Sequence, residues 1–188
     1  MQSLQEPRIA SRSWVEAVSV WPLEADDLEI AARWLAEDRN GRWLDFGTVT
    51  APSPLALRVM AGRDAHSIFV YGPPDEHRPV GLVALGNIQP RFGTAEAWCV
   101  LGEKEYGPRD LTVRAAAFLL EHAFGTEGLT CVYAWTAEVN RGGRRLLQRL
   151  GFREAGRLRS SHRIDGRTCD RIWFDLLADE YDGYGELQ

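Results

Sequence analysis

Apolar positions recur along this chain at two spacings, three to four residues apart in some segments and two apart in others. The first helical pattern follows the acidic pair Asp26-Asp27 and runs from Leu28 to Leu35 before Asn40-Gly41 ends it. Carboxylates at the start of a helix are favourable because they face the positive end of its dipole. A second, shorter helix is expected over Leu55 to Ala61, after an irregular stretch.

Strand patterns separate these helices from two later ones. Val80 to Ile88 is continuously apolar, as a strand buried on both faces would be. The last two strands are joined by Asp165-Gly166, a strong hairpin signal. The expected strands are Val15 to Leu23, Ser67 to Tyr71, Val80 to Ile88, Thr94 to Leu101, Leu129 to Thr136, Arg157 to Ile164 and Thr168 to Leu177.

Two further helices complete the pattern. One runs from Leu111 to Phe124, and the other begins at Asn140, a good helix cap, and closes at Gly151. The order β-α-(α)-β-β-β-α-β-α-β-β predicts an α/β (α+β) fold with one mixed central sheet and helices on both faces. Residues 1–13 are polar and aperiodic, so we expect a flexible N-terminal extension before one domain over residues 14–182.

Size and charge narrow the classes of protein. A chain of 188 residues with 45% hydrophobic and 26% charged residues is typical of one globular domain. The formal net charge of −5 disfavours non-specific binding to nucleic acid or to an anionic membrane. No apolar run approaches the ~20 residues of a membrane span, and the first residues show no signal-peptide pattern. We therefore expect a cytoplasmic protein with no nucleic-acid or membrane partner.

The cysteines and histidines argue against a metal site. Cys99, Cys131 and Cys169 are odd in number and lie in strand-like runs, which favours buried free thiols. The four histidines show no spacing typical of metal ligands. We therefore expect no metal cofactor.

The loop between the strand ending at Leu101 and the helix beginning at Leu111 has the position of an anion site. A loop that opens a helix offers backbone N–H groups and the positive end of the helix dipole to a phosphate. Pro108, however, has no N–H, and Asp110 brings a carboxylate to the place where the anion would lie. The position of this loop therefore favours phosphate binding, whereas its composition disfavours it.

A set of short motifs in a fixed order is the most specific signal in the chain. The motifs are Pro79-Val80-Gly81-Leu82-Val83, Arg91-Phe92-Gly93-Thr94-Ala95-Glu96, Ala123-Phe124, Asn140 through Leu150-Gly151-Phe152, and Asp165-Gly166. Over roughly residues 15–180 the chain resembles the GCN5-related N-acetyltransferase (GNAT) superfamily, in particular its ribosomal-protein alanine acetyltransferase branch. The resemblance implies that the strand Thr94 to Leu101 splays from its neighbour, and that acetyl-CoA or another acyl-CoA is the co-substrate.

The resemblance also implies the cofactor contacts. The end of the splayed strand would bind the pantetheine arm through its backbone, and an N–H of Val100 or Leu101 would stabilise the tetrahedral oxygen. The following loop would hold the pyrophosphate, and the helix after Asn140 would contact the pantetheine and the nucleotide. The residues implied are Cys99, Val100, Leu101, Gly107, Arg109, Asp110, Leu111, Thr112, Asn140 and Arg145.

The loop departs from the family pattern Arg/Gln-x-x-Gly-x-Gly/Ala. Gly107 stands at the basic position, and Asp110 and Thr112 stand at the two late small residues. Three compensations stay open: Arg109 pairs with the phosphates, Asp110 turns outward and caps the helix, or Thr112 donates its hydroxyl. A family member that has lost tight CoA binding is the remaining alternative.

Direct acyl transfer needs a neutral amine and a stabilised thiolate leaving group. Glu96 is the candidate catalytic base, because the two-residue alternation places it on one strand face with Trp98. Leu147 stands where many family members have a Tyr acid, so water or another residue would protonate the thiolate. Unassisted attack by the amine, and a role for His162 or Tyr106, stay open.

The acceptor pocket is expected between the first helix, the irregular segment that follows it and the final hairpin. Its candidate lining consists of Asp45, Phe46, Trp98 and Trp135, with Asp45 suited to hold a cationic amine. Tryptophans at these positions equally suit a plain hydrophobic core.

The sequence therefore predicts an acyl-CoA-dependent N-acyltransferase. The expected reaction is acetyl transfer from acetyl-CoA to a primary amine by direct attack in a ternary complex. The acceptor is a small molecule or a peptide, and the enzyme a monomer or homodimer. The alternatives are a non-catalytic or altered acyl-CoA-binding protein on the same fold, and O-acylation or decarboxylation of an acyl thioester.

Overall fold

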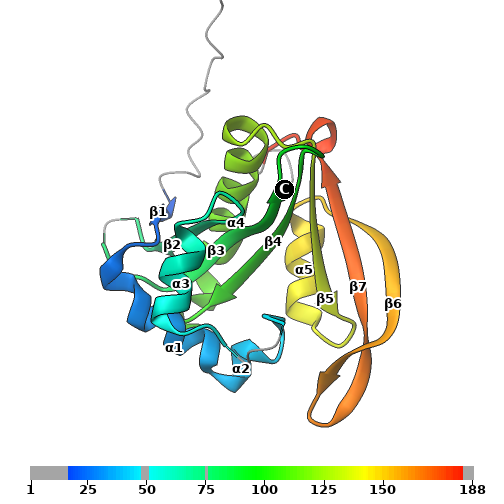
Figure 1. Ribbon diagram of the computed structural model, residues 1–188, viewed down its shortest axis with the longest axis horizontal. Coiled ribbons are helices and arrows are strands. Elements are labelled where there is room, and N and C mark those ends of the chain that lie inside the picture. The colour runs from blue at the N-terminus through cyan, green and yellow to red at the C-terminus, as the bar shows by residue number, and fades with distance from the viewer. Residues whose placement is uncertain (1–16, 48–50, 75, 184–188) are drawn as a thin grey trace, which may run out of the picture.

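The computed structural model describes residues 17–47, 51–74 and 76–183, with the backbone alone at positions 108 and 109. Seven strands form one sheet in the order β1-β2-β3-β4-β5-β7-β6 (Figure 1). Neighbouring strands are antiparallel except β4 and β5, which are parallel. The strands are β1 (Ser19–Pro22), β2 (Ser67–Gly72), β3 (Gly81–Gln89), β4 (Thr94–Leu101), β5 (Cys131–Ala137), β6 (Arg153–Ile164) and β7 (Arg167–Leu177). The predicted mixed sheet is confirmed; the predicted extension over residues 1–13 lies outside the described residues.

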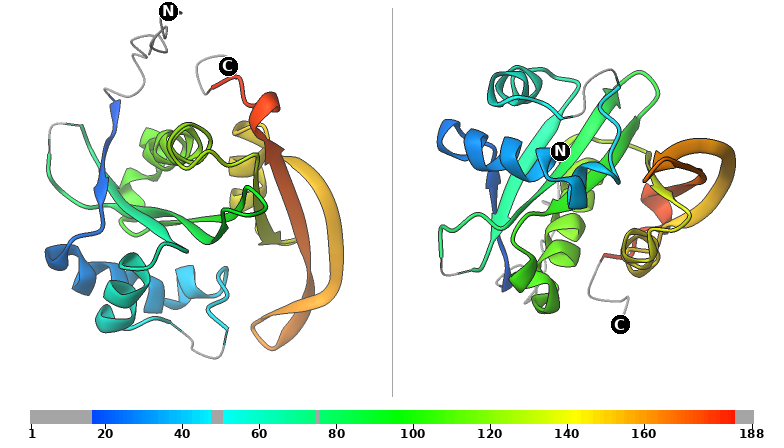
Figure 2. Two further views of the ribbon diagram at one scale, coloured as in Figure 1. Left: turned by 45° about the horizontal axis from the view of Figure 1, so that its top comes forward. Right: turned by 90° about the horizontal axis from the view of Figure 1, so that it is seen from below.

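The helices lie on both faces of this sheet, as predicted. The segment that holds α1 and α3 covers one face, and α4 covers the other (Figure 2). A short 3-10 segment, η3 (Lys104–Arg109), leads from β4 into α4. The helices are α1 (Leu28–Ala36), α2 (Asp38–Gly41), α3 (Pro54–Ala61), α4 (Leu111–Glu121) and α5 (Arg141–Arg149). None of the described helices is long and apolar enough to cross a membrane.

The central strands are buried on both faces, which explains the continuous apolar run in β3. Leu82 packs into the cluster formed with α1 and α3, whereas the next residue, Val83, packs into the cluster on the α4 side. Successive strand side chains point to opposite faces, so β3 contributes to two separate cores. The larger core also takes Leu147 and Leu150 of α5, which places α5 on the same side of the sheet as α4.

The first helical segment is interrupted where the sequence pattern predicts one continuous helix. The chain is extended at Glu37 (φ −64°, ψ 126°), and α2 begins one residue later. Asn40, which is almost fully buried, donates its side-chain N–H to the Trp34 carbonyl at 2.9 Å. This side-chain bond satisfies a carbonyl that the end of a helix leaves without a partner.

Several element boundaries also differ from the predictions. β1 is shorter than Val15 to Leu23, and Val15 lies outside the described residues. β6 begins at Arg153 rather than Arg157. This strand lies at the edge of the sheet, where the side chains need not alternate between apolar and polar, and two register shifts in its pairing with β7 interrupt any regular pattern. The predicted hairpin turn is confirmed, since Asp165 (φ 50°) and Gly166 (φ 76°) both adopt the left-handed conformation of such turns.

The burial pattern of α3 gives a direct test of the fold. Leu57 is fully buried and Leu55 on the same helix is 71% exposed. We expect Leu57→Ala to lower the free energy of unfolding by about 2–5 kcal/mol and Leu55→Ala by less than ~0.5 kcal/mol, measured by urea denaturation. Equal losses for the two variants would contradict the assignment of this helix face.

Candidate active site

A cavity opens where β4 and β5 separate. The two strands pair at only three positions, from Thr94↔Cys131 to Glu96↔Tyr133, and the rest of β4 pairs with β3 alone. The cavity beside this opening has a volume of about 820 Å³ and reaches from α2 to the first turns of α4 and α5. Its size is within the range of small-molecule sites. The splayed strand implied by the family resemblance is present.

The register of β4 determines which backbone groups face the opening. The Gly102 N–H donates to the Val80 carbonyl, and the Cys131 N–H donates to the Gly93 carbonyl. Because backbone groups alternate sides along a strand, even-numbered residues of β4 bond toward β3 and odd-numbered ones toward the opening. Cys99 and Leu101 therefore present their N–H and C=O groups to the cavity, whereas those of Val100 point toward β3.

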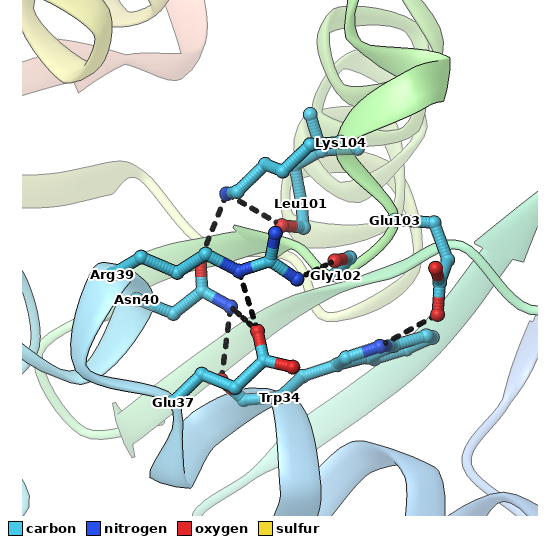
Figure 3. A network of polar contacts seen from close by, with 8 residues as sticks. All are labelled: Trp34, Glu37, Arg39, Asn40, Leu101, Gly102, Glu103 and Lys104. Atoms are coloured by element: carbon cyan, nitrogen blue, oxygen red, sulfur yellow. Dashed lines mark hydrogen bonds and ion pairs between the residues drawn. The ribbon is translucent and has the colours of Figure 1, made fainter.

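A polar network ties the end of β4 to the helix segment below it (Figure 3). Lys104 donates to the Leu101 carbonyl at 2.7 Å and to the Asn40 side chain at 2.8 Å. Arg39 donates to the Gly102 carbonyl at 3.0 Å. A side chain at Gly102 would have no room, since an added Cβ would lie 2.1 Å from the Trp34 ring. These contacts make α2 one wall of the cavity.

Lys104 is a cavity residue that the sequence reasoning missed. Its partial desolvation, aided by the neighbouring Arg39 guanidinium, lowers its pKa below the ordinary lysine value. One sequence signal was available: Lys104 is the only lysine in a chain with 22 basic residues. A lone lysine directly after the implied pantetheine strand is an unusual choice in an arginine-rich chain.

The loop before α4 holds its carboxylate in a different way from the one expected. Asp110 adopts a left-handed conformation (φ 56°) and makes no side-chain cap to the helix, so the capping alternative is wrong. Its carboxylate instead accepts two hydrogen bonds from Arg149 of α5, at 2.8 and 3.2 Å. This contact with Arg149 keeps the pKa of Asp110 below its ordinary value.

The other loop residues have distinct places. Gly107 and Thr112 line the cavity, and the Thr112 hydroxyl lies 2.6 Å from that of Tyr71. Leu111 is buried in the larger core. The side chain of Arg109, implied as a phosphate ligand, lies outside the described residues.

Asn140 caps α5, as predicted, by accepting the Gly143 N–H at 3.0 Å. Its side chain also lines the cavity, together with Gly142 and Gly143. The two glycines differ in the space around them. An added Cβ at Gly143 would lie 2.7 Å from the Thr136 hydroxyl and 2.8 Å from the Asn140 amide, whereas at Gly142 the nearest atom is 3.7 Å away. Close packing at the start of α5 therefore requires a glycine at only one of these positions.

Glu96 lies at the last position where β4 and β5 pair, and it lines the cavity. Burial raises the pKa of its carboxyl above the ordinary value, and a hydrogen bond from the Trp135 indole at 2.9 Å partly offsets that rise. A carboxylate with a raised pKa and a cavity wall position has the properties of a general base. By contrast, desolvation raises the pKa of the Cys99 thiol to about 11, which keeps it protonated near neutral pH.

The predicted acceptor residues surround the same end of the cavity. Phe46 packs edge-on against Trp98, with ring centroids 5.9 Å apart. Asp45 is already bound, by the Arg171 guanidinium at 2.5 Å and the Gly47 N–H at 2.8 Å, and the Arg171 contact lowers its pKa. Arg171, which the sequence reasoning missed, also lies over the Trp135 ring at 4.1 Å from its centroid.

Most of the candidate residues thus meet at one cavity although they come from distant parts of the chain. Leu147 lines it as well, but the two weaker candidates do not: Tyr106 is buried in the core, and His162 lines a second, smaller cavity. The predicted residues that line the main cavity are Asp45, Phe46, Glu96, Trp98, Cys99, Val100, Leu101, Gly107, Thr112, Trp135, Asn140 and Arg145. The described residues include no cluster of His, Cys, Asp or Glu that could hold a metal ion.

A match to a family model gives the class of this protein. Residues 17–153 match the family model of the acetyltransferase (GNAT) domain. The chain therefore belongs to the GNAT acetyltransferase family, which confirms the resemblance seen in its motifs.

Comparison with solved structures gives the same fold. Ribosomal-protein-S5-alanine acetyltransferase from Vibrio fischeri is 20% identical, with 88% of this chain and 96% of that chain covered and a TM-score of 0.71. RimJ from Mycobacterium smegmatis, in complex with CoA-disulfide, is 22% identical, with 90% and 87% covered and a TM-score of 0.74. Spermidine N-acetyltransferase from Vibrio cholerae, in complex with CoA and spermine, is 21% identical, with 88% and 98% covered and a TM-score of 0.78. A sequence comparison with curated proteins finds no match.

The two neighbouring glycines of α5 provide a test of the site geometry. Gly142→Ala is expected to raise the free energy of unfolding by about 0.5–1 kcal/mol, because alanine favours a helix where space permits. Gly143→Ala should lower it by ~1 kcal/mol or more, because the new methyl group displaces the Asn140 cap. Thermal and urea unfolding measure both. A stabilising Gly143→Ala would contradict the packing described for Asn140 and Thr136.

Proposed function

We propose that this protein transfers the acetyl group of acetyl-CoA to a primary amine in a ternary complex. The amine nitrogen attacks the thioester carbonyl carbon and forms the new C–N bond. The C–S bond then breaks, and CoA leaves as a thiolate. The attacking nitrogen loses its proton to a base, and the thiolate takes a proton from water or a nearby donor.

The observation that carries this proposal is the open side of β4. The N–H and C=O groups of Cys99 and the N–H of Leu101 face the cavity, and a pantetheine arm carries amide groups that pair with such a strand edge. By the same alternation, Leu101 rather than Val100 is our candidate donor to the tetrahedral oxygen. The Leu101 carbonyl is bonded to Lys104, so that ammonium group would lie beside the bound arm.

The charges along the cavity indicate how the two substrates are oriented. Among the described residues, its basic side chains are Arg39, Lys104, Arg145 and Arg149, which come from α2, the start of η3 and α5. Its carboxylates are Asp45 and Glu96. Opposite charges attract strongly in a partly desolvated cavity, so we place the CoA phosphates toward the basic side and the reacting amine toward Glu96. RimJ from Mycobacterium smegmatis is in complex with CoA-disulfide and spermidine N-acetyltransferase from Vibrio cholerae with CoA and spermine, which supports CoA as the co-substrate here.

We assign the role of base to Glu96. Burial makes its carboxylate more basic than that of an ordinary glutamate, which suits it to take a proton from the ammonium group of the acceptor so that the neutral amine can attack. The protonated Cys99 thiol is a poor nucleophile, which favours direct attack by the amine over an acetyl-enzyme on that residue.

A second candidate function is acyl-CoA binding without catalysis on the same fold. Two observations favour it: Leu147 replaces the usual tyrosine acid, and the Asp110 carboxylate lies at the expected phosphate loop. The two functions are separated by measuring free CoA released from acetyl-CoA over a broad amine panel, together with the thermal shift that acetyl-CoA causes. Release that depends on the amine supports catalysis, and a thermal shift with no release supports binding alone. The absence of both release and a thermal shift would rule out both functions.

The role of Glu96 can be tested through its pH profile. A base must be deprotonated, so kcat/KM falls as pH falls through the pKa of Glu96. Trp135→Phe removes the hydrogen bond that lowers this pKa, and the acidic limb of the profile should move to higher pH. Glu96→Gln should lower kcat/KM by about 100-fold or more. An unchanged profile in both variants would show that the amine attacks without this base.

The Asp110–Arg149 pair should weaken CoA binding, because the carboxylate repels phosphates and occupies a cationic side chain. Asp110→Asn keeps the left-handed backbone, which asparagine tolerates, and removes the charge. We expect the KM for acetyl-CoA to fall about two- to fivefold, the size of an exposed ion pair. Asp179→Asn, an exposed carboxylate that lines neither cavity, is the control. A raised KM in Asp110→Asn would show instead that the pair holds the loop in its binding conformation.

A further inference from the structure

A second cavity of about 440 Å³ lies next to the first, between the loop after α2 and the β6–β7 hairpin. The two cavities share the wall formed by Leu44, Asp45 and Phe46. A molecule that passes this shared wall would extend from the reacting end of the first cavity into the second. The second cavity is therefore placed to bind the part of the acceptor that does not react.

The lining of this cavity is rich in positive charge. Three arginines border it, Arg42, Arg163 and Arg171, whereas Asp45 is the only carboxylate among its described lining residues. Asp45 is already engaged by Arg171. Hydroxyl groups complete the polar lining, from Ser160, Ser161 and Thr168. Guanidinium and hydroxyl donors together suit an oxyanion such as a carboxylate.

Carboxylates pair with two of these three arginines, Arg42 and Arg171. Arg42 pairs with Asp38 and Asp165, but those carboxylates are 82% and 68% exposed, so water screens them strongly. No ion pair to Arg163 is found in the described ranges. The ring of His162 bonds to the Arg42 carbonyl at 2.7 Å and adds no negative charge. Arg163 is thus the arginine of this lining that has no ion pair among the described residues.

A short chain of contacts connects this charge to the reacting centre. Arg171 lies over the Trp135 ring, and the Trp135 indole donates to Glu96 at 2.9 Å. The Trp135 side chain thus lies between Arg171 of the second cavity and the candidate base. Asp45 acts as a positioning residue here, because its bond to Arg171 fixes where that guanidinium lies.

We propose that the acceptor is a primary amine that also carries a carboxylate, which binds in the second cavity against Arg163 and Arg171. This inference rests on the proposed acetyl transfer and narrows its substrate class. A second ammonium group at the same place would meet the arginines and be repelled. The site therefore selects amino acids, or peptides with an acidic residue near their N-terminus, over diamines and polyamines.

Matched acceptors that differ only in their far end test the proposal. With acetyl-CoA and the full chain, we compare γ-aminobutyrate, butylamine and putrescine, and then shorter and longer members of each series. Ala-Asp-Glu and Ala-Lys-Lys peptides form a second arm that separates free amino acids from peptide N-termini. We expect kcat/KM for the amino acid or the acidic peptide to exceed that of its neutral or cationic counterpart by about tenfold or more, as one charge-assisted contact gives.

A variant pair locates the preference in the second cavity. Arg163 is exposed, so Arg163→Gln should fold normally, and it should reduce the preference for the carboxylate by about threefold. Arg163→Lys should restore part of it, because the charge remains. Arg159→Gln, on the same strand but outside both cavities, should leave the preference unchanged. The ratio between two acceptors is insensitive to a general loss of stability.

The possible failures are distinguishable. Turnover of butylamine or putrescine as fast as γ-aminobutyrate, with no preference for the acidic peptide, would overturn the carboxylate site and leave acetyl transfer intact. A preference that survives Arg163→Gln unchanged would overturn the assignment to Arg163. The absence of CoA release with every amine and peptide would overturn the proposed function itself, and this inference with it.

Discussion

The structure depends on the point at which two parallel strands stop pairing. β4 and β5 share three paired positions and then diverge, while β4 stays bonded to β3 on its other side. Backbone N–H and C=O groups need partners, so an open strand edge inside a fold persists only where something else satisfies it. Lys104 does so for one carbonyl, and α4 and α5 bound the opening. The cavity is thus a consequence of the way in which β4 and β5 diverge.

The fold could be predicted from the sequence to a large extent because its signals are local. The apolar run of β3, the Asp165-Gly166 turn and the Asn140 cap each depend on neighbours only a few residues away. The break after Ala36 was not predictable in this way. It requires the Asn40 amide to turn back to the Trp34 carbonyl, which a periodic pattern does not reveal.

The candidate site was predicted less completely, since its decisive contacts join residues far apart in the chain. Asp45 and Arg171 are separated by 126 positions, and Asp110 and Arg149 by 39. Each of these carboxylates was noted in the sequence, but its partner was not. The role of Asp45 as an amine ligand stays a prediction. Charge pairing across a fold follows from tertiary packing, which residue types and spacing do not determine. The strand that carries Glu96 and Cys99 was found because a motif and an alternation pattern coincide there.

The single lysine at the mouth of the cavity has a practical consequence. Among the 22 lysine and arginine side chains of this sequence, Lys104 is the only lysine. It therefore carries the only primary amine of these side chains, since the others are guanidinium groups. Its lowered pKa leaves a larger fraction of the amine unprotonated than in an ordinary lysine. Amine-reactive reagents therefore modify one side chain, and that side chain contacts the strand at which we propose that the cofactor arm binds. Protection of Lys104 from such a reagent provides a direct, label-based measure of cavity occupancy that does not require turnover.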